Sequence, residues 1–384
     1  MRTVTCTAPV NIAVIKYWGK RDTELILPTN DSLSVTLSQD ILHSKTTISA
    51  CKSFEQDRLW LNGKEEDITK NRRMHNCFRE ARALRKKMED ESSELEPLST
   101  YKVHVCSENN FPTAAGLASS ASGLAALVYT LAQLYELQIS TSDLSRIARQ
   151  GSGSACRSLF GGFVAWEMGS ASDGSDSKAV QIAPETHWPE LEALVCVVSD
   201  AKKGTSSTEG MQHTVETSEL MQARISTVVP QRMANIKQAI LNRDFNTFAE
   251  ITMRDSNQFH AVCLDTYPPI SYLNDTSRAI MRVIHEYNKD GVKAAYTYDA
   301  GPNAVIYAPR ENMPEIIRLI AHYFPPPATI TLSIITRSSH KKVIPIFPAG
   351  SVSRLLHTKV DDGPRTLAED EALLNSQGLP KRLA

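Results

Sequence analysis

The sequence lacks several features that would assign it to a specialised class of protein. Its 42 Lys and Arg residues nearly balance its 43 Asp and Glu residues, which leaves a formal net charge of −1 over 384 residues. No excess of positive charge therefore favours nucleic acid, because binding its phosphates requires a basic surface. No segment approaches the ~18 consecutive apolar residues of a membrane-spanning helix. We expect neither a nucleic-acid nor a membrane partner.

Paired cysteines and a secretory leader are also missing from the pattern. The seven cysteines are scattered, odd in number and form no Cys-x-x-Cys pair, which argues against a disulfide framework or a zinc site. In the opening stretch MRTVTCTAPVNIAVIKYWGK, Asn11 and Lys16 interrupt the apolar run and no cleavage-like region follows. These absences predict a soluble, cytoplasmic, globular protein with free thiols.

The length and the mixed periodicity predict an α+β protein of two domains. A chain of 384 residues is long for a single core, and the pattern divides best into residues 1–190 and 191–384. Alternating or apolar runs predict strands at 4–14, 33–37, 46–50, 58–61, 101–107, 161–166, 191–199, 292–298, 304–308 and 353–360. Helical periodicity predicts helices at 70–87, from 119 onward, and at 142–149, 214–242 and 244–258. The pattern is weakest over 325–355.

A loop rich in small residues is the first candidate for chemistry. Residues 112–123 read PTAAGLASSASG and lead into a helix expected from about Ser119. Unpaired N–H groups at a helix start suit phosphate, and Ser119, Ser120 and Ser122 add hydroxyl donors or a metal ligand. No Gly-Lys-Ser/Thr closes the loop, so it is not a Walker A sequence. The alternative is a small-residue helix start that packs against a neighbour.

Two lysines and two aromatic residues crowd the end of the first expected strand. The stretch NIAVIKYWGKRD (11–22) places Lys16, Tyr17, Trp18 and Lys20 around Gly19, with both ammonium groups and both polar aromatic tips at one mouth. Mobile point charges of this kind suit a polyanionic substrate. The alternative is a solvated strand end without a function.

Two further segments combine glycine with one charged side chain each. In GSGSACR (151–157) the glycines allow close backbone approach, and Arg157 can form a bidentate pair with a carboxylate or phosphate. In YDAGPN (298–303) Asp299 could serve a phosphoryl-transfer site as a carboxylate beside a hydroxyl or Mg²⁺. Both segments could equally be plain turns. By the same residue-level reasoning His260 is a packed core histidine, and Cys156 serves packing.

Together these strings resemble mevalonate diphosphate decarboxylases, within the superfamily that includes galactokinase, homoserine kinase, mevalonate kinase and phosphomevalonate kinase. The resemblance rests on residues 11–22, 109–123, 151–163 and 298–304, and it runs from about residue 3 to residue 310. Kinases of the superfamily place a catalytic Asp in the segment that corresponds to 151–160. Here that segment holds no carboxylate, and Asp299 is the remaining candidate.

The resemblance implies a fold and a reaction. The fold would combine an N-terminal domain similar to ribosomal protein S5 domain 2 with a ferredoxin-like C-terminal domain that carries Asp299. The reaction would convert (R)-5-diphosphomevalonate and ATP, with Mg²⁺, into isopentenyl diphosphate, ADP, phosphate and CO₂ for isoprenoid and sterol synthesis. Family members commonly form homodimers. The alternatives are a mevalonate or phosphomevalonate kinase without decarboxylation and a non-catalytic nucleotide-binding paralogue.

The same resemblance implies roles for individual residues. Asp299 would act at the C3 hydroxyl as base or orienting group, Arg157 and Asn11 at the substrate carboxylate, and Lys16 at the reacting end. Further expected substrate contacts are Tyr17, Trp18, Gly19, Lys20, Arg73, Ser152, Gly153, Ser154, Ala155, Cys156 and Thr208. Expected ATP contacts are Ala114, Gly116, Leu117, Ser119, Ser120, Ser122 and Lys202, with Ser120 also on the metal.

Overall fold

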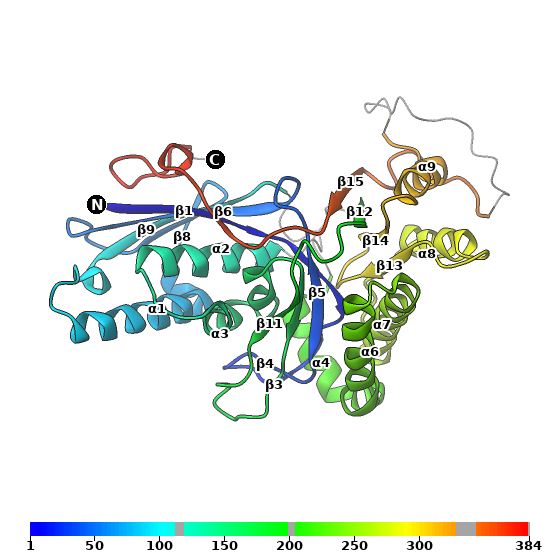
Figure 1. The fold of residues 1–384 in the computed structure, drawn as a ribbon, viewed down its shortest axis with the longest axis horizontal. Coiled ribbons are helices and arrows are strands. Elements are labelled where there is room, and N and C mark those ends of the chain that lie inside the picture. Colours follow the sequence, from blue (N-terminus) through cyan, green and yellow to red (C-terminus); the bar gives the residue numbers. More distant parts are fainter. Residues whose placement is uncertain (112–118, 199–203, 328–342, 383–384) are drawn as a thin grey trace.

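The structure is a computed structural model that describes residues 1–111, 119–198, 204–327 and 343–382 (Figure 1). It mixes helices and sheets throughout, which confirms the α+β expectation. Among the described helices, none combines the length and the apolar character needed to cross a membrane.

A six-stranded sheet forms one side of the molecule. Its strands run in the order β16-β1-β6-β9-β7-β8, and all neighbours are antiparallel except β7 and β9. The strands are β1 (Arg2–Pro9), β6 (His43–Cys51), β7 (Arg58–Leu61), β8 (Lys64–Glu66), β9 (Lys102–Asn109) and β16 (Arg365–Thr366). Asn62 and Gly63 both have positive φ and form the turn between β7 and β8.

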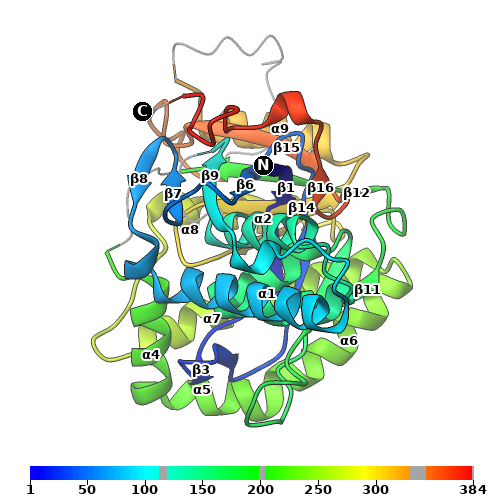
Figure 2. The same cartoon turned by 90° about the vertical axis from the view of Figure 1, so that its left-hand side faces the viewer.

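Three helices cover one face of this sheet. They are α1 (Arg72–Glu91), α2 (Ser119–Leu134) and α3 (Thr141–Gly151). α2 packs directly on β1 and β6, while α1 contacts α2 and α3, so that α2 and α1 lie in successive layers below the sheet (Figure 2). Leu127 and Leu131 of α2 meet Ile48 and Val105 of the sheet in one buried cluster.

A second sheet stands at the middle of the molecule. Its order is β11-β10-β5-β2, all antiparallel, and a separate two-stranded sheet joins β3 and β4. The strands are β2 (Asn11–Ile15), β3 (Lys20–Asp22), β4 (Leu27–Pro28), β5 (Ser32–Thr36), β10 (Phe163–Trp166) and β11 (Ala179–Ala183).

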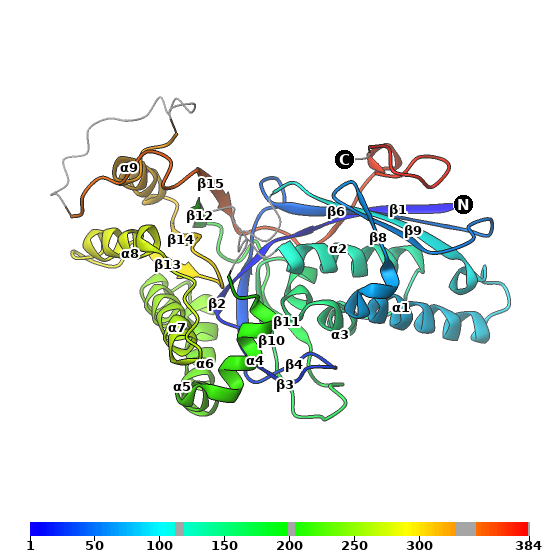
Figure 3. The same cartoon turned by 180° about the vertical axis from the view of Figure 1, so that it is seen from behind.

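The described residues of the second half add a third sheet and six helices. The sheet order is β13-β14-β12-β15, from β12 (Leu191–Val197), β13 (Ala295–Tyr298), β14 (Ala304–Pro309) and β15 (Arg354–Lys359). The helices are α4 (Ser207–Thr217), α5 (Glu219–Ala223), α6 (Val229–Leu241), α7 (Phe245–Asp265), α8 (Asp275–Tyr287) and α9 (Met313–Tyr323). α7 packs against both β2 and β13 and so joins the second and third sheets (Figure 3).

Several short helical turns complete the chain. The 3-10 turns are η1 (Ile68–Lys70), η2 (Leu98–Thr100), η3 (Gly153–Leu159) and η5 (Glu369–Glu371), and a π-helical turn, η4, spans Arg224–Val228.

One hydrophobic core runs through both expected domains. Ile12 and Val35 of the second sheet share a buried cluster with Val195, Phe248 and Ile306 of the second half. β16 also returns to pair with β1, so the end of the expected second domain lies in the first sheet. The division at residue 190 and the two domain labels stay predictions.

The helix expected over residues 214–242 is wrong as a single element. α4 ends at Thr217, Ser218 is extended, and α5, η4 and α6 follow. The Ser218 hydroxyl donates to Asp265 at 2.6 Å, an interaction with α7 that overrides the local helical pattern. α8 and α9 were not expected from the sequence at all.

Candidate active site

The first turns of three helices surround one cavity of about 460 Å³ between the two halves of the molecule. α1, α2 and α4 supply Arg73, Ser120 and Thr208 from these turns. Helix starts carry unpaired N–H groups and the positive end of the dipole, so the cavity favours anions. Its walls are Asn11, Ala13, Lys16, Tyr17, Trp18, Lys20, Ile26, Asn71, Arg73, Ser120, Leu124, Gly151, Ser152, Gly153, Ser154, Arg157, Ser207, Thr208, Met211, Phe259, Asp299 and Ala300.

A buried lysine and a carboxylate from opposite halves meet in this cavity. Lys16 Nζ donates to Asp299 Oδ1 at 2.6 Å and to the Ala13 carbonyl at 2.6 Å. The lysine side chain is 3% exposed, whereas the carboxylate is 29% exposed, so the aspartate reaches the open cavity. Burial lowers the pKa of Lys16, and the charges of Asp299 and Asp255 act against that shift. The pair can hold and orient a hydroxyl group of a ligand.

Arg157 is a buried cation that lacks a carboxylate partner among the described residues. Its Nε donates to Ser34 Oγ at 3.0 Å and its Nη1 donates to Ser32 Oγ at 2.6 Å. Burial lowers the pKa of the guanidinium, yet an arginine side chain remains charged in proteins. Neutral partners leave that charge uncompensated, and a ligand carboxylate would neutralise it.

Asn11 lies beside Arg157 on the cavity wall. Its Nδ2 donates to Ser158 Oγ at 2.7 Å and to the Ser154 carbonyl at 3.1 Å. Its Oδ1 is buried and has no hydrogen-bond partner in the part of the chain that the structure describes. A buried acceptor without a donor is costly, so the amide is poised for a ligand that donates a hydrogen bond.

A second group of cations lines another part of the cavity. Lys20 and Arg73 are both partly buried, and Arg73 Nη2 donates to Thr208 Oγ1 at 3.3 Å. Burial, together with the charge of Arg73, lowers the pKa of Lys20 to about 8. Two neighbouring cations repel each other, and a ligand with several negative charges removes that repulsion.

Tyr17 and Trp18, the aromatic residues that follow β2, pack into the walls of the cavity. The Tyr17 ring packs on Trp166 with centroids 4.6 Å apart, and its hydroxyl is buried without a partner. Burial raises the pKa of that phenol, so it stays protonated. Trp18 is 2% exposed and its Nε1 donates to Thr214 Oγ1 at 3.0 Å. The expectation that the Trp18 polar tip faces the mouth is therefore wrong, because α4 supplies its partner.

A second cavity of about 530 Å³ adjoins the first. The two share Asn71, Ser120, Leu124 and Ser207 as wall residues. Leu59, Leu61, Met74, Val105, Leu124 and Leu127 give the second cavity an apolar wall, and Asn62, Ser107 and Asn109 are among the polar residues that also line it. Apolar walls with a few placed polar groups suit a flat heterocycle such as a nucleotide base. The shared wall lets one ligand extend from this cavity toward the reacting residues of the other.

The structure brings most of the predicted site residues together and leaves some apart. Fourteen described ones line the two cavities: Asn11, Lys16, Tyr17, Trp18, Lys20, Arg73, Ser119, Ser120, Ser152, Gly153, Ser154, Arg157, Thr208 and Asp299. Four others line neither cavity: Gly19, Ser122, Ala155 and Cys156. Ala114, Gly116, Leu117 and Lys202 lie outside the described residues.

The buried members of the predicted set have local roles. Ser122 is fully buried and shares a 2.7 Å hydrogen bond with Ser44. Cys156 is fully buried, and burial raises the pKa of its thiol to about 12, which fits packing. His260 is also buried, as expected, and burial lowers the pKa of its imidazole to about 3.

Several wall residues were not found from the sequence. Asn71 is the N-cap of α1 and lines both cavities, and a capping residue before the basic helix could have indicated it. Ser207 in α4 and Phe259 in α7 also line the first cavity. Their patterns are those of ordinary helices, so no local signal separates them from other helical residues.

The fold and this anion-binding cavity together define a protein of the small-molecule kinase superfamily that includes galactokinase and mevalonate kinase. Residues 8–179 match the model of the diphosphomevalonate decarboxylase-like N-terminal domain. Residues 193–367 match the model of the mevalonate 5-diphosphate decarboxylase C-terminal domain.

Similarity to diphosphomevalonate decarboxylases extends over nearly the whole chain. The diphosphomevalonate decarboxylase of Ganoderma lucidum is 61% identical over 394 aligned residues, with 98% of each chain covered. An X-ray structure of mevalonate 5-diphosphate decarboxylase is 50% identical, with a TM-score of 0.89 and 98% of this chain and 99% of that chain covered. A structure of MDDEF in complex with MVAPP, AMPPCP and magnesium is 31% identical, with a TM-score of 0.77 over 95% of this chain and 98% of that chain. The chain belongs to the mevalonate 5-diphosphate decarboxylase family.

Proposed function

We propose that this protein catalyses the ATP-dependent decarboxylation of (R)-5-diphosphomevalonate to isopentenyl diphosphate, with release of ADP, phosphate and CO₂. The observation that carries the proposal is the content of one cavity. It holds the Lys16–Asp299 pair, the guanidinium of Arg157 without a carboxylate partner among the described residues, and the cations Lys20 and Arg73. These groups match a substrate with a hydroxyl, a carboxylate and a diphosphate.

The charges support one orientation of the substrate. The diphosphate would bind Lys20 and Arg73, where two cations lie together near the first turn of α4. The carboxylate would meet Arg157, and the C3 hydroxyl would lie against Asp299. Asn11 would bind the carboxylate only after its amide turns, because Nδ2 now donates to Ser158 and Ser154 and the unpartnered atom is the acceptor Oδ1. The cavity then holds the leaving carboxylate and the reacting hydroxyl at separate groups.

The residues divide the chemistry into positioning and charge stabilisation. Asp299 would orient the tertiary hydroxyl of the substrate and accept its proton. Lys16 fixes the carboxylate of Asp299 through the 2.6 Å hydrogen bond. The Asp299 side chain is 29% exposed, so it would release that proton to solvent before the activated oxygen leaves. Its restored negative charge would then favour the positive charge that develops at C3. Arg157 holds the substrate carboxylate through a buried guanidinium that already binds Ser32 and Ser34. Binding the substrate carboxylate too tightly would oppose its loss as CO₂, because it would stabilise the negative charge that must disappear.

ATP and Mg²⁺ fit the second cavity and its boundary with the first. ATP supplies the phosphoryl group that turns a tertiary hydroxyl into a leaving group. The apolar walls would hold the base, and Ser119 and Ser120 at the start of α2 would meet the phosphates. Among the described residues, no group of three or more His, Cys, Asp and Glu could hold a metal. Mg²⁺ would therefore bind mainly phosphate oxygens and water, with the Ser120 hydroxyl as a candidate protein ligand.

Product analysis tests the function. The protein is incubated with (R)-5-diphosphomevalonate, ATP and Mg²⁺, and CO₂, ADP and isopentenyl diphosphate are measured together. We expect one CO₂ for each ADP. ADP with a stable phosphorylated product and no CO₂ would instead identify a kinase. Nucleotide binding without any turnover would identify a non-catalytic paralogue.

We also propose that the protein acts in the cytoplasm as a homodimer. The family resemblance and the free cysteines support this proposal. Fractionation of cells would test the location. Sedimentation analysis of the purified protein would test the dimer, and a single monomeric species at assay concentration would exclude it.

A further inference from the structure

The main chain of Lys16 is held by side chains rather than by a strand partner. β2 ends at Ile15, and Lys16 is 2% exposed, so its N–H and C=O groups are buried just beyond the sheet. Buried main-chain groups without partners are costly. The N–H donates to Asp255 Oδ2 at 2.7 Å. The C=O accepts from Arg224 Nη2 at 3.0 Å and from Asn30 Nδ2 at 3.1 Å.

Asp255 and Arg224 form one buried ion pair. Both side chains are 0% exposed, and Arg224 Nη1 and Nη2 donate to Asp255 Oδ1 and Oδ2 at 2.9 and 3.0 Å. Arg232 also donates to Asp255 Oδ1 at 3.0 Å from a side chain that is 18% exposed. Although burial opposes it, the charge of Arg224 helps to hold the pKa of Asp255 below its usual value.

Arg224 lies in an irregular, π-helical part of the chain. Arg224 is the first residue of the π-helical turn η4, between α5 and α6. Such turns insert an extra residue into a helix and redirect the side chains around it. Asp255 comes from the middle of α7, which packs against β2. Both residues therefore reach Lys16 from the other half of the molecule.

We propose that the Arg224–Asp255 pair positions Lys16 for catalysis. The pair fixes both main-chain polar groups of Lys16, and this sets where Nζ meets Asp299. Neither side chain lines the cavity, so they are positioning residues that act through Lys16. A buried ion pair adds little net stability compared with apolar residues of the same size, which leaves positioning as its main contribution. The inference rests on the proposed function.

The first test is Asp255→Asn in the full-length protein. We expect kcat to fall about 10- to 100-fold, because small misplacement of reacting groups carries a cost of that size. KM for diphosphomevalonate should change by about twofold or less, because Lys20 and Arg73 still hold the diphosphate. The concentration of binding-competent protein is measured by calorimetric titration, so that misfolded molecules are not counted in kcat.

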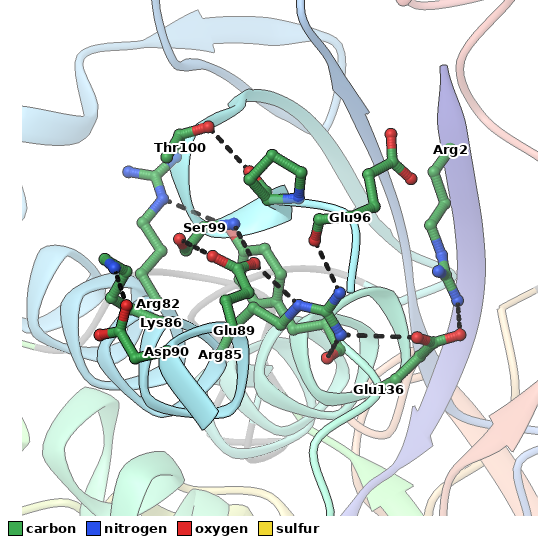
Figure 4. Close-up of polar contacts among 12 residues, drawn as sticks. Arg2, Arg82, Arg85, Lys86, Glu89, Asp90, Glu96, Ser99, Thr100 and Glu136 are labelled. Atoms are coloured by element: carbon green, nitrogen blue, oxygen red, sulfur yellow. Dashed lines mark hydrogen bonds and ion pairs between the residues drawn. The ribbon is translucent and has the colours of Figure 1, made fainter. Parts of the chain in front are cut away.

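A second buried pair supplies the matched control. Arg85 donates to Glu89 at 2.9 Å and also to the main-chain carbonyls of Tyr135 and Glu96, with side chains 1% and 7% exposed for the arginine and the glutamate (Figure 4). It lines neither of the two cavities. Glu89→Gln removes the same charge from the same kind of pair, and we expect kcat per folded molecule to stay unchanged.

A double-mutant cycle separates positioning from a general structural role. In a Lys16→Met background, Asp255→Asn should cause little further loss of kcat, because the group it positions is already gone. If Asp255→Asn lowers kcat by the same factor in the unaltered protein and in the Lys16→Met variant, the proposal is overturned.

A paired substitution keeps the test usable if Asp255→Asn folds poorly. Arg224→Met with Asp255→Leu removes both fully buried charges at once. Arg232 loses its carboxylate partner, but its side chain is 18% exposed and it keeps the hydrogen bond to Gln258. We expect a folded protein with the same fall in kcat, and full kcat in this variant would overturn the inference. If the unaltered protein releases no CO₂, the proposed function fails. If it does and these variants match it, only the positioning role fails.

Discussion

Two lysines in one cavity have lowered pKa values for the same main reason, yet they occupy different surroundings. Burial is the largest cause for both Lys16 and Lys20. Lys16 has Asp299 at 2.6 Å to support its charge, whereas Lys20 has Arg73 as a charged neighbour, which opposes its charge. Lys16 therefore has a counter-charge before substrate arrives, whereas Lys20 depends on the incoming diphosphate for compensation.

Substrate affinity should fall as the pH rises through the pKa of Lys20. That pKa is about 8, so Lys20 is charged below this pH and neutral above it. We expect KM for diphosphomevalonate to rise toward about tenfold per pH unit above the pKa. Lys20→Arg should make KM nearly independent of pH over this range, because arginine stays protonated. A KM of the unaltered protein that is flat across pH 8 would contradict the prediction.

Asp299→Asn should separate binding from turnover. The amide keeps the size of the side chain but loses the charge and the ability to accept a proton. We expect kcat to fall by about 10²- to 10⁴-fold, the usual contribution of a positioned acid or base. Calorimetry should still detect diphosphomevalonate, since Lys20, Arg73 and Arg157 are unchanged. Near-normal turnover would remove Asp299 from the mechanism.

At the residue scale, sequence reasoning found groups that are clustered in short segments. Lys16 and Lys20 stand at one strand end, and Arg157 follows Gly151 and Gly153 within one short segment. Asp255 and Arg224 were missed because they lie inside helices whose local pattern is ordinary, and they reach Lys16 only through the packing of α7 on β2. Their contact depends on tertiary structure, which no local pattern records.

The connection between β2 and β3 depends on a single glycine. Gly19 has a φ of +89°, and a Cβ atom there would come within 2.7 Å of Thr29 Oγ1 and 2.9 Å of Met221 Cε. An L side chain in this conformation is strained, and the close contacts add to that strain. The residue thus lets Trp18 stay buried while Lys20 faces the cavity.

Gly19→Ala should lower stability and weaken substrate binding. Gly291→Ala is the matched control, because Gly291 also has positive φ but no atom within 4 Å of the added Cβ. We expect the control to cost about 1–2 kcal/mol of unfolding free energy from backbone strain alone. Gly19→Ala should cost more and raise KM. Denaturant titration and KM measurements check both, and equal effects of the two variants would show that the contacts are unimportant.

At the scale of elements, the sequence predicted the start of α2 correctly. It did not predict that a tertiary contact interrupts the helical pattern at Ser218. α2 begins at Ser119 as expected, because an Ala- and Leu-rich run follows small residues. The helix over 214–242 is broken at Ser218 by a hydrogen bond to Asp265, which lies far away in the sequence. α8 and α9 were not expected, although buried residues recur in them at helical spacing, as Ile280 and Ile284 do in α8 and Ile316 and Ile320 do in α9.

At the scale of the molecule, the last part of the chain completes the first sheet. Residues after β15 cross back to pair β16 with β1, and the Gly378 carbonyl lies 2.8 Å from His104 Nδ1. Leu374 is 3% exposed and packs with Trp60 and Cys106. These contacts fasten the end of the chain to the N-terminal half without touching the cavity walls.

Leu374→Ala should therefore lower the free energy of unfolding and leave kcat per folded molecule unchanged. Removing a buried leucine costs about 2–5 kcal/mol, depending on how far the site collapses. The control Leu220→Ala truncates a side chain of a residue that is 48% exposed, and it should change stability by less than about 0.5 kcal/mol. Thermal unfolding measures both variants. A fall in kcat per folded molecule for Leu374→Ala would show coupling between this segment and the site.

The pairing of β16 with β1 has a consequence for biosynthesis. Cys6 and Thr366 face each other in this ladder although 360 positions separate them along the chain. At about 5–20 residues per second, a ribosome needs roughly 20–70 s to make the second partner after the first. One edge of β1 is open during that interval, and open strand edges invite pairing with other chains. We therefore expect newly made chains to associate with one another more readily before β16 is made than after it pairs with Cys6 and Thr7.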